Sequence, residues 1–472
     1  MTGLRPAPGP EGAAAPPPSA SVTAVVGLLV LFEVVSGFLQ AGIAPLLPGI
    51  GDLLEVSDSA LTWVVSVQLL AAAVCVPAFG RLGDLYGHRR MLRIALASVA
   101  VGSVLVAVAP SFPVLLLGRL LQGPLAALLP LEIALVRDRL PVPLARRAIA
   151  RLVGALTLGG LLGGLGMGLA DHALGDVRLA LWVAAALAVA CVPVSFVAVP
   201  ESARRASGRV DWPGVALLSL AMVALLGGVS GAAKSGWLSA GTLGPLALGA
   251  LLLAVWTAVE LRSAEPLVDL RAMAGRHVAP FYLTSFVFGV LYFGSQSPNS
   301  TFMAADPGAD GYGFGLSALA IALAMLPGML AAVACSALTP RIAERTGYRV
   351  ALAGAFALVA AGSAGFALFH GAAWQMAACL LVAGAGMGTA LSAMPTVIVE
   401  ASDPSRTGIA TALYNNVKTL GGAVAGGVFG TLLGGVGGAA GYVAVWLVSG
   451  VCALLAAGCA LIATRRETGG TV

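Results

Sequence analysis

Two glutamates lie inside long apolar runs of this chain, where a carboxyl group has a definite chemical use. Glu33 stands at the centre of the run from Leu29 to Gly42, and Gly37 and Gln40 follow it on the same helix face. An ionised carboxylate inside a membrane costs roughly 2.5 kcal/mol or more, whereas contact with water favours the charged form. Such a group can take up a proton and release it as a site opens to either side. A structural glutamate bonded to a neighbour is the alternative.

Glu132 is the other deep carboxyl group, and it lies five residues before Arg137. Counted along a regular helix, it points about 140° away from Arg119, which favours a group near the membrane surface that pairs with a base. Arg119 shares a helix face with Gln122, so we expect it to line a cavity or to pair with an acid. A nearby Arg119 would also favour the charged form of Glu33. We therefore retain Glu33, Arg119 and Glu132 as candidates for proton coupling.

Most of the candidate substrate-binding residues come from two other apolar segments. Lys418 lies in "YNNVKTLGG", where it either balances a charge or binds an anionic group. The segment 279–304 holds seven of the 22 Phe and Tyr residues and two amides. Aromatic walls with a few amides suit large, partly apolar ligands, although aromatics that pack helices or face lipid fit equally well. The predicted cargo-binding residues are Gln40, Gln122, Phe288, Tyr292, Gln296, Asn299, Tyr414, Asn415 and Lys418.

The elements that must hold these residues are membrane helices. The chain is 59% hydrophobic and only 10% charged, whereas a soluble domain is about a quarter charged. A helix needs about 20 apolar residues to cross the hydrocarbon core of a bilayer. The six cysteines fall inside such runs and have no metal-site spacing, so we expect core residues. Fourteen runs have the required length: 22–47, 59–80, 91–109, 112–137, 147–169, 178–199, 213–231, 242–261, 279–304, 316–338, 350–369, 375–399, 408–432 and 440–463.

The arginines predict the orientation of these helices. With a cytoplasmic N-terminus and fourteen crossings, 22 of the 26 basic residues fall on the inner side. Only Arg178 and Lys234 fall outside, and Arg119 and Lys418 lie within helices. This is the distribution that the positive-inside rule predicts. The net charge of +5 is therefore a sign of topology and gives no reason to expect nucleic acid as a partner.

Two loops repeat one another at a distance of 260 residues. The loop "GRLGDLYGHRR" (80–90) aligns with "PRIAERTGYRV" (340–350), and Pro130 and Asp138 have counterparts in Pro395 and Asp403. Two parallel copies of a six-helix unit are typical of transporters built from repeats. The predicted organisation is a disordered cytoplasmic tail (1–20), an N-terminal six-helix bundle (21–200), two inserted transmembrane helices with linkers (201–265), a C-terminal six-helix bundle (266–464) and a cytoplasmic tail (465–472).

These motifs resemble the major facilitator superfamily, specifically its fourteen-helix drug:proton antiporters. The 80–90 loop is similar to the family signature between helices 2 and 3, and "LGRLLQGPLAA" (117–127) to the helix-4 signature. The resemblance implies a proton-transfer role for Arg119 and a latch that joins the two halves on the inside. "LGGLLGG" (158–164) resembles the helix-5 antiporter signature but has a second glycine where the family has proline. The residues assigned to the latch are Gly80, Asp84, Gly87, Arg89, Arg90 and Asp138.

The expected protein is an all-α polytopic membrane protein of the major facilitator fold that exports a drug-like or antibiotic compound in exchange for protons. Import of a small nutrient by a facilitator or proton symporter is the alternative, which the departure in helix 5 leaves open. The four histidines do not cluster and no phosphate-binding loop is present. We therefore expect no enzyme activity, metal, cofactor or ATP, and a monomer in a bacterial inner membrane with both termini cytoplasmic. The high arginine, alanine and glycine content suggests a GC-rich bacterial genome.

Overall fold

The computed structural model describes residues 20–198, 211–235, 239–263, 270–273, 278–401 and 407–462, and all regular structure within them is helical. The predicted tails apart from Ala20, the loop residues Arg204, Arg205, Arg209, Arg276 and Arg406, and Asp403 lie outside this part of the chain. The elements in chain order are α1 (Ala20–Gly42), η1 (Ala44–Leu46), α2 (Leu47–Leu54), α3 (Asp58–Tyr86), α4 (His88–Val108), α5 (Phe112–Leu121), η2 (Gly123–Ala127), α6 (Leu128–Arg139), α7 (Val142–Leu174), α8 (Val177–Ala198), α9 (Trp212–Ser235), α10 (Ala240–Arg262), α11 (Leu270–Met273), α12 (Ala279–Gly294), α13 (Gln296–Ala304), α14 (Ala318–Thr346), α15 (Tyr348–Leu368), α16 (Ala373–Ala401), α17 (Thr407–Val436) and α18 (Gly438–Ile462).

Twelve helices of the described residues are long and apolar enough to cross a membrane. The predicted block 279–304 is broken into α12 and α13 at Ser295, and the block 213–231 corresponds to α9, whose described apolar stretch is short. The chain is therefore a multi-pass membrane protein with twelve candidate spans, and the count of fourteen crossings stays a prediction.

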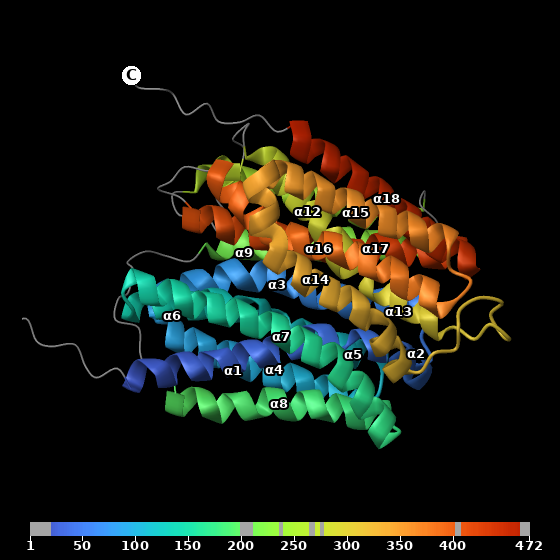
Figure 1. Ribbon diagram of the computed structural model, residues 1–472, viewed down its shortest axis with the longest axis horizontal. Helices are drawn as coiled ribbons and strands as arrows, with labels where there is room; N and C mark the ends of the chain where they lie inside the picture. The colour runs from blue at the N-terminus through green and yellow to red at the C-terminus, as the bar shows by residue number, and fades with distance from the viewer. Residues whose placement is uncertain are drawn as a thin grey trace, which may run out of the picture.

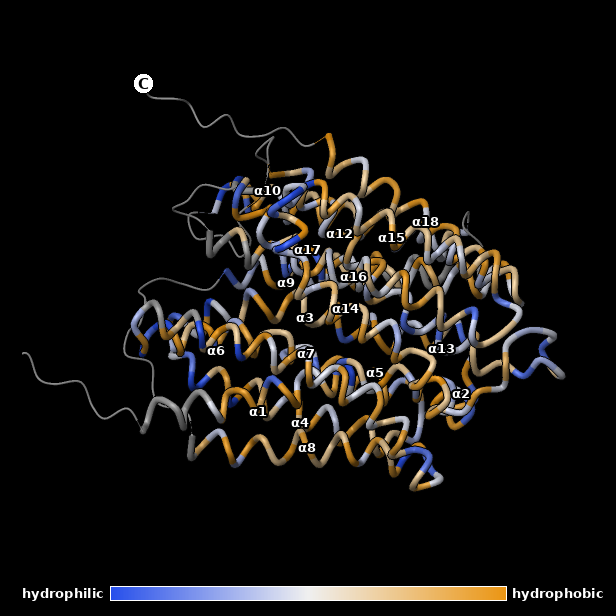
Figure 2. The backbone as a smooth tube through the Cα atoms, viewed as in Figure 1, coloured by the Kyte–Doolittle hydropathy of each residue, from blue (hydrophilic) through white to orange (hydrophobic). Residues whose placement is uncertain are grey.

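The helices form two bundles that lie side by side (Figure 1). Elements α1 to α8 make the N-terminal bundle, and α12 to α18 make the C-terminal bundle. Helices α9 and α10 pack on each other, and α9 also contacts α17 and α3. Hydrophobic residues follow the helices along their length, and hydrophilic residues gather at the two ends (Figure 2). This pattern is what a bilayer crossed by many helices requires.

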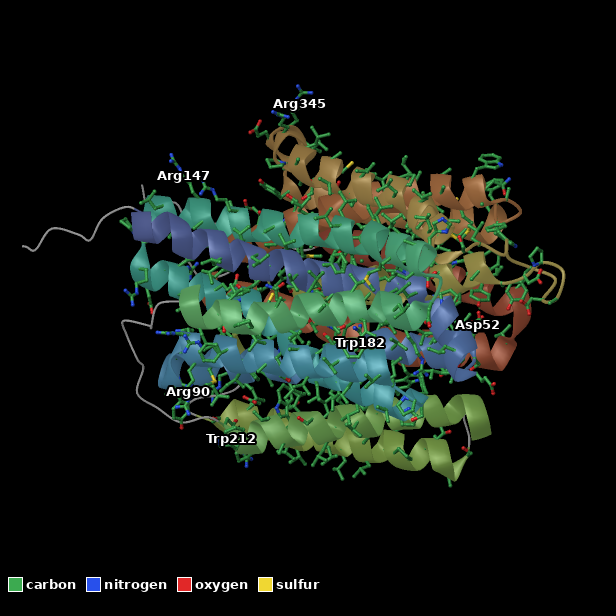
Figure 3. All side chains as sticks on the ribbon, turned by 90° about the horizontal axis from the view of Figure 1, so that it is seen from below. Asp52, Arg90, Arg147, Trp182, Trp212 and Arg345 are labelled. Carbon is green, nitrogen blue, oxygen red and sulfur yellow. The ribbon has the colours of Figure 1, made fainter. Side chains whose placement is uncertain are left out.

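The basic residues mark one end of the molecule. Arg90, Arg147 and Arg345 lie toward one end of the helices and Asp52 lies at the other (Figure 3). We call these the arginine-rich end and the arginine-poor end. The predicted separation of charges along the chain is thus confirmed in space for these residues.

The repeat of the two loops is also confirmed. Gly87 joins α3 directly to α4 with φ of 102°, and Gly347 joins α14 to α15 with φ of 81°. Glycine adopts this left-handed region without the strain that a side chain causes. At the other end of the same helices, the hydroxyls of Ser57 and Ser317 cap α3 and α14 by accepting from the backbone N–H three residues later.

The two bundles meet along two seams that begin at the arginine-poor end. The hydroxyl seam joins α3 to α17, and the apolar seam joins α7 to α14. In the apolar seam, a Cβ added to Gly168 would lie 2.9 Å from the Cβ of Ala322, and one added to Gly164 would meet Met329. Toward the arginine-rich end, α7 and α14 diverge (Figure 1). The bundles are therefore closed at one end and separated at the other along this pair of helices.

Candidate functional site

The carboxyl groups of Glu33 and Glu132 meet inside the N-terminal bundle. Both side chains are 0% exposed, and the two carboxyl groups lie close enough to influence each other electrostatically. No donor in the described part of the chain forms a hydrogen bond to any of their four oxygens. The residues that precede them in the sequence, Phe32 and Leu131, belong to one buried apolar cluster. Glu33 comes from α1 and Glu132 from α6, so the pair depends on the contact between these helices.

The expectation of a basic partner for Glu132 is wrong, because its carboxyl faces Glu33. The helix that carries Glu132 is interrupted, so an angle counted along a regular helix does not give the direction of its side chain relative to Arg119. Between α5 and α6 the chain forms the 3₁₀ segment η2, which starts at Gly123 and Pro124. A 3₁₀ segment has about three residues per turn, so it rotates α6 relative to α5. Gly123 is needed there, since an added Cβ would lie 2.3 Å from that of Ala71.

This arrangement fits a proton-binding site. Two carboxylates in contact and away from water cannot both be charged, because like charges at short range and lost hydration both favour the neutral acid. A shared proton satisfies one donor and one acceptor and leaves a single negative charge. Water reaching the pair from one end would allow the proton to leave.

Arg119 does not join this pair. Its Nε donates to the carbonyl oxygen of Val64 at 2.8 Å, and its Nη1 donates to Oε1 of Gln122 at 2.6 Å. The Gln122 amide in turn donates to the Ser103 hydroxyl at 2.8 Å. None of these described hydrogen bonds joins Arg119 to Glu33, whereas Arg119 and Gln122 share a helix face, as expected.

The Arg119 chain of hydrogen bonds borders a small cavity. Arg119, Gln122, Ser103 and Phe38 are among its lining residues, and it has room for about one water molecule. The arginine therefore lines a cavity, as expected, but this cavity is too small for cargo. In this state, Arg119 and its hydrogen-bond partner Gln122 link α5 to α3 and α4 through buried hydrogen bonds.

Lys418 lies in the C-terminal bundle on α17. Its Nζ donates to Oδ1 of Asn415 at 3.2 Å and lies 5.3 Å from the ring centroid of Tyr414. The Tyr414 hydroxyl is buried and has no hydrogen-bond partner among the described residues. The rings of Phe288 and Tyr292 stack at 5.5 Å on the adjacent helix α12. The predicted members of this group are thus brought together.

The other predicted cargo residues are placed differently. Phe288 is fully buried, whereas Tyr292 is 37% exposed. Asn299 accepts a hydrogen bond from the Trp446 indole at 2.9 Å inside the C-terminal bundle. The Gln296 amide donates to the carbonyl of Tyr292, and that of Gln40 donates to the Ser36 hydroxyl. Packing therefore accounts for Phe288 and Asn299 in this state, and their role as cargo residues stays a prediction.

The hydroxyl seam was not predicted, although its pattern is visible in the sequence. Three hydroxyls of α3 donate to glycine carbonyls of α17: Ser59 to Gly430 at 2.6 Å, Thr62 to Gly426 at 2.8 Å and Ser66 to Gly422 at 3.5 Å. An added Cβ on Gly426 would lie 1.7 Å from the Ser66 Oγ. Glycines spaced four apart allow such close approach of membrane helices. The helical spacing of these hydroxyl residues and of these glycines is the feature of the sequence from which the contact could have been predicted.

Further bonds close the arginine-poor end around this seam. The Tyr442 hydroxyl of α18 donates to the Asp58 carboxylate at the start of α3. The Ser300 hydroxyl of α13 donates to the carbonyl of Ala44 at 2.7 Å. Each of these bonds joins the C-terminal bundle to the N-terminal bundle. The end is therefore held by directional bonds as well as by packing.

Among the predicted latch residues, Asp84 makes its described ion pair within its own bundle. Asp84, with a side chain 49% exposed, pairs with His88 at 3.2 Å. Gly87 forms the turn, and nothing surrounds Gly80 within 4 Å of an added Cβ. Arg90 is exposed, and the described contacts include no pairing of Arg90 with Asp138. The latch between the halves stays a prediction for a state in which the arginine-rich end is closed.

A family model and three known proteins match this chain. The model of the Major Facilitator Superfamily matches residues 29–426. The chain is 28% identical over 444 residues to the probable actinorhodin transporter of Streptomyces coelicolor, covering 91% of this chain and 75% of that protein. It is 29% identical over 420 residues to the multidrug efflux pump LfrA of Mycolicibacterium smegmatis, covering 87% and 80%. The crystal structure of the nucleoside transporter NupG matches with a TM-score of 0.68 and 14% identity over 93% of this chain and 100% of that one, which shows the fold alone.

Proposed function

This chain belongs to the major facilitator superfamily of secondary transporters, and on that basis we propose that it exports a drug-like or antibiotic organic compound in exchange for protons. The family moves small molecules across membranes and is not a family of enzymes. Two relatives, named as a probable actinorhodin transporter and a multidrug efflux pump, support the export of an organic compound.

The buried contact between Glu33 and Glu132 carries the proposal of proton exchange. It is an acid pair without a basic partner among the described residues, in an apolar part of a membrane protein. A shared proton is stable while the pair is dry and is lost when water and a change of packing favour the charged forms. Binding and release of that proton are therefore linked to the state of the bundle.

The change between inward-facing and outward-facing states takes place at the two seams between the bundles. With the arginine-rich end assigned to the cytoplasm by the positive-inside rule, the structure corresponds to an inward-facing transporter whose outer end is closed. Rocking of the bundles would break the hydroxyl seam and bring the inner ends of α7 and α14 together, as in alternating access. Glu33 and Glu132 belong to different helices of one bundle, so this motion can alter their contact and their access to water.

Transport in reconstituted vesicles tests the direction of exchange. The purified protein is placed in vesicles with a pH-sensitive dye inside, and a gradient of the candidate compound is imposed without a pH gradient. We expect protons to move opposite to the compound, and the movement to disappear in the double variant Glu33→Gln/Glu132→Gln. Protons moving in the same direction as the compound would support import by symport instead, and transport without proton movement would contradict coupling.

A further inference from the structure

Lys418 occupies the place where the contact between the bundles ends. Gly430, Gly426 and Gly422 lie along one stripe of α17 and contact α3, and Lys418 is the next residue of that stripe, four positions before Gly422. An added Cβ on Gly422 would lie 2.7 Å from the Leu69 side chain of α3. The lysine therefore lies about one turn beyond the closed seam, toward the arginine-rich end.

The neighbouring helix of its own bundle fixes the backbone at this point. A Cβ added to Gly289 of α12 would lie 1.8 Å from the carbonyl oxygen of Lys418. Helices α12 and α17 thus touch at the backbone, and the side chains that border the contact are held at defined positions. Tyr292, one turn farther along α12, is 37% exposed.

The ammonium group of Lys418 has fewer partners than it can bind. Its described neighbours are Oδ1 of Asn415 and the face of the Tyr414 ring, and no described acidic residue forms an ion pair with it. An ammonium has three N–H donors. A cation at membrane depth without a counter-ion is costly, so such residues face a cavity or pair with a negative group.

The rest of the cluster could hold a flat, partly polar molecule. Tyr414 has a buried hydroxyl without a partner among the described residues. The stacked rings of Phe288 and Tyr292 lie on the facing helix. Rings bind planar apolar surface, and an unpaired hydroxyl or amide fixes its orientation.

Comparison of the repeats argues against a purely architectural lysine. The segment 157–160 of α7 reads Thr-Leu-Gly-Gly, as does 419–422 of α17, so Lys418 corresponds to Leu156. Gly37 packs on the carbonyl oxygen of Leu156 just as Gly289 packs on that of Lys418. The same backbone contact forms with an apolar side chain, so the helix packing does not require a positive charge.

We propose that the transported compound is an organic anion with a planar aromatic part, and that Lys418 is its counter-ion. The negative group of the compound takes the donors of Lys418 that the protein leaves open, and its rings lie against Tyr414 and Tyr292. This inference rests on the proposed function, since it names the chemical class of the compound that this transporter moves.

Equilibrium binding to the full-length protein in lipid nanodiscs tests this proposal. The probe is 1-hydroxy-2-naphthoate, compared with the uncharged 1-hydroxy-2-naphthamide of the same shape. We expect the wild type to bind the acid at least about tenfold more tightly than the amide, which is the usual size of a charge-pair effect. Lys418→Met should lose this preference but still bind the amide, Lys418→Arg should keep it, and the matched change Leu156→Met in the other bundle should leave it unaltered.

The proposal is overturned if the wild type binds both probes equally or neither, or if Lys418→Met retains the preference for the acid. Retained binding of the amide shows that Lys418→Met is folded. Because no gradient is present, the result does not depend on proton coupling. A wild type that prefers the acid but moves no protons in vesicles would support the anion site and contradict the exchange of protons.

Discussion

The two bundles are copies of one unit, and they differ most at their buried charges. Contacts between glycine and backbone are repeated closely: Gly159 packs on the carbonyl of Val34, and Gly421 packs in the same way on that of Phe286. By this correspondence Glu33 matches Ser285, whose hydroxyl simply bonds its own helix at 2.6 Å. Conversely, Lys418 matches Leu156 in the N-terminal bundle.

The same contrast holds on the helix of the second deep acid. Pro130 and Pro395 align, so Glu132 corresponds to Val397 and Arg119 corresponds to Gly384. Val397 is 2% exposed within an apolar core. Glycines that permit close packing are shared because both bundles need them. The acids belong to one bundle and the lysine to the other, which separates the proposed proton site from the proposed cargo site.

The substitution with the largest predicted effect changes only the proposed proton site. Glu132→Gln keeps the size and hydrogen-bonding capacity of the side chain but cannot release a proton. We expect transport driven by a pH gradient to fall to background in vesicles, while exchange of labelled for unlabelled compound continues. The matched control is Glu400→Gln, an exposed glutamate on α16, the corresponding helix of the other bundle. Full pH-driven accumulation in Glu132→Gln would mean that the difference between the bundles does not concern protons.

A second prediction acts on the seam that both bundles share. Gly426→Ala places a methyl group within 1.7 Å of the Ser66 Oγ, and relieving such overpacking costs about 1–3 kcal/mol. We expect the closed arginine-poor end to open. Spin labels at Leu174 and Phe369, one in each bundle, would report a longer distance in a background with the six native cysteines replaced by serine. Gly154→Ala is the control, since nothing lies within 4 Å of its added Cβ. Unaltered distances would show that this contact does not hold the end closed.

A smaller effect distinguishes the hydroxyl seam from the apolar seam. Thr62→Val preserves the shape of the side chain but removes the hydrogen bond to the carbonyl of Gly426. Loss of one such bond costs about 1 kcal/mol, or about a fivefold change in the equilibrium between closed and open ends. The same labels would measure it, with Thr157→Val as the control, because that exposed hydroxyl bonds only its own helix. Equal populations of the closed and open states in Thr62→Val and Thr157→Val would show that packing alone holds this seam together.

The smallest effect concerns the loops at the arginine-rich end. Asp84→Asn removes an exposed pairing with His88 that is worth about 0.2–1 kcal/mol, so thermal stability should change little. We expect a modest reduction in transport rate, because the latch is proposed to form only when this end closes. Glu344→Gln, the counterpart in the second loop, makes the same test in the other bundle. Unchanged transport rates in both Asp84→Asn and Glu344→Gln would mean that these loops only fix the orientation of the helices in the membrane.

Composition and repeats were sufficient to predict much of the architecture. Apolar runs of membrane length, arginines in alternate loops and the repeated loops around Gly87 and Gly347 predicted a helical transporter with two related halves. The pairing of Glu33 with Glu132 could not be predicted, because it depends on the rotation that η2 introduces between α5 and α6. The hydroxyl seam joins residues about 360 positions apart, and a sequence alone does not say which helices of two bundles face one another.

The most direct test of the central claim follows the proton on the acid pair itself. The transported compound, once identified in vesicles, is added to weakly buffered purified protein, and the released protons are measured with a pH indicator. We predict that the wild type and Ser285→Ala release protons when the compound binds, and that Glu33→Gln binds the compound without releasing them. Equal proton release from Glu33→Gln and the wild type would contradict the assignment of the coupled proton to Glu33 and Glu132.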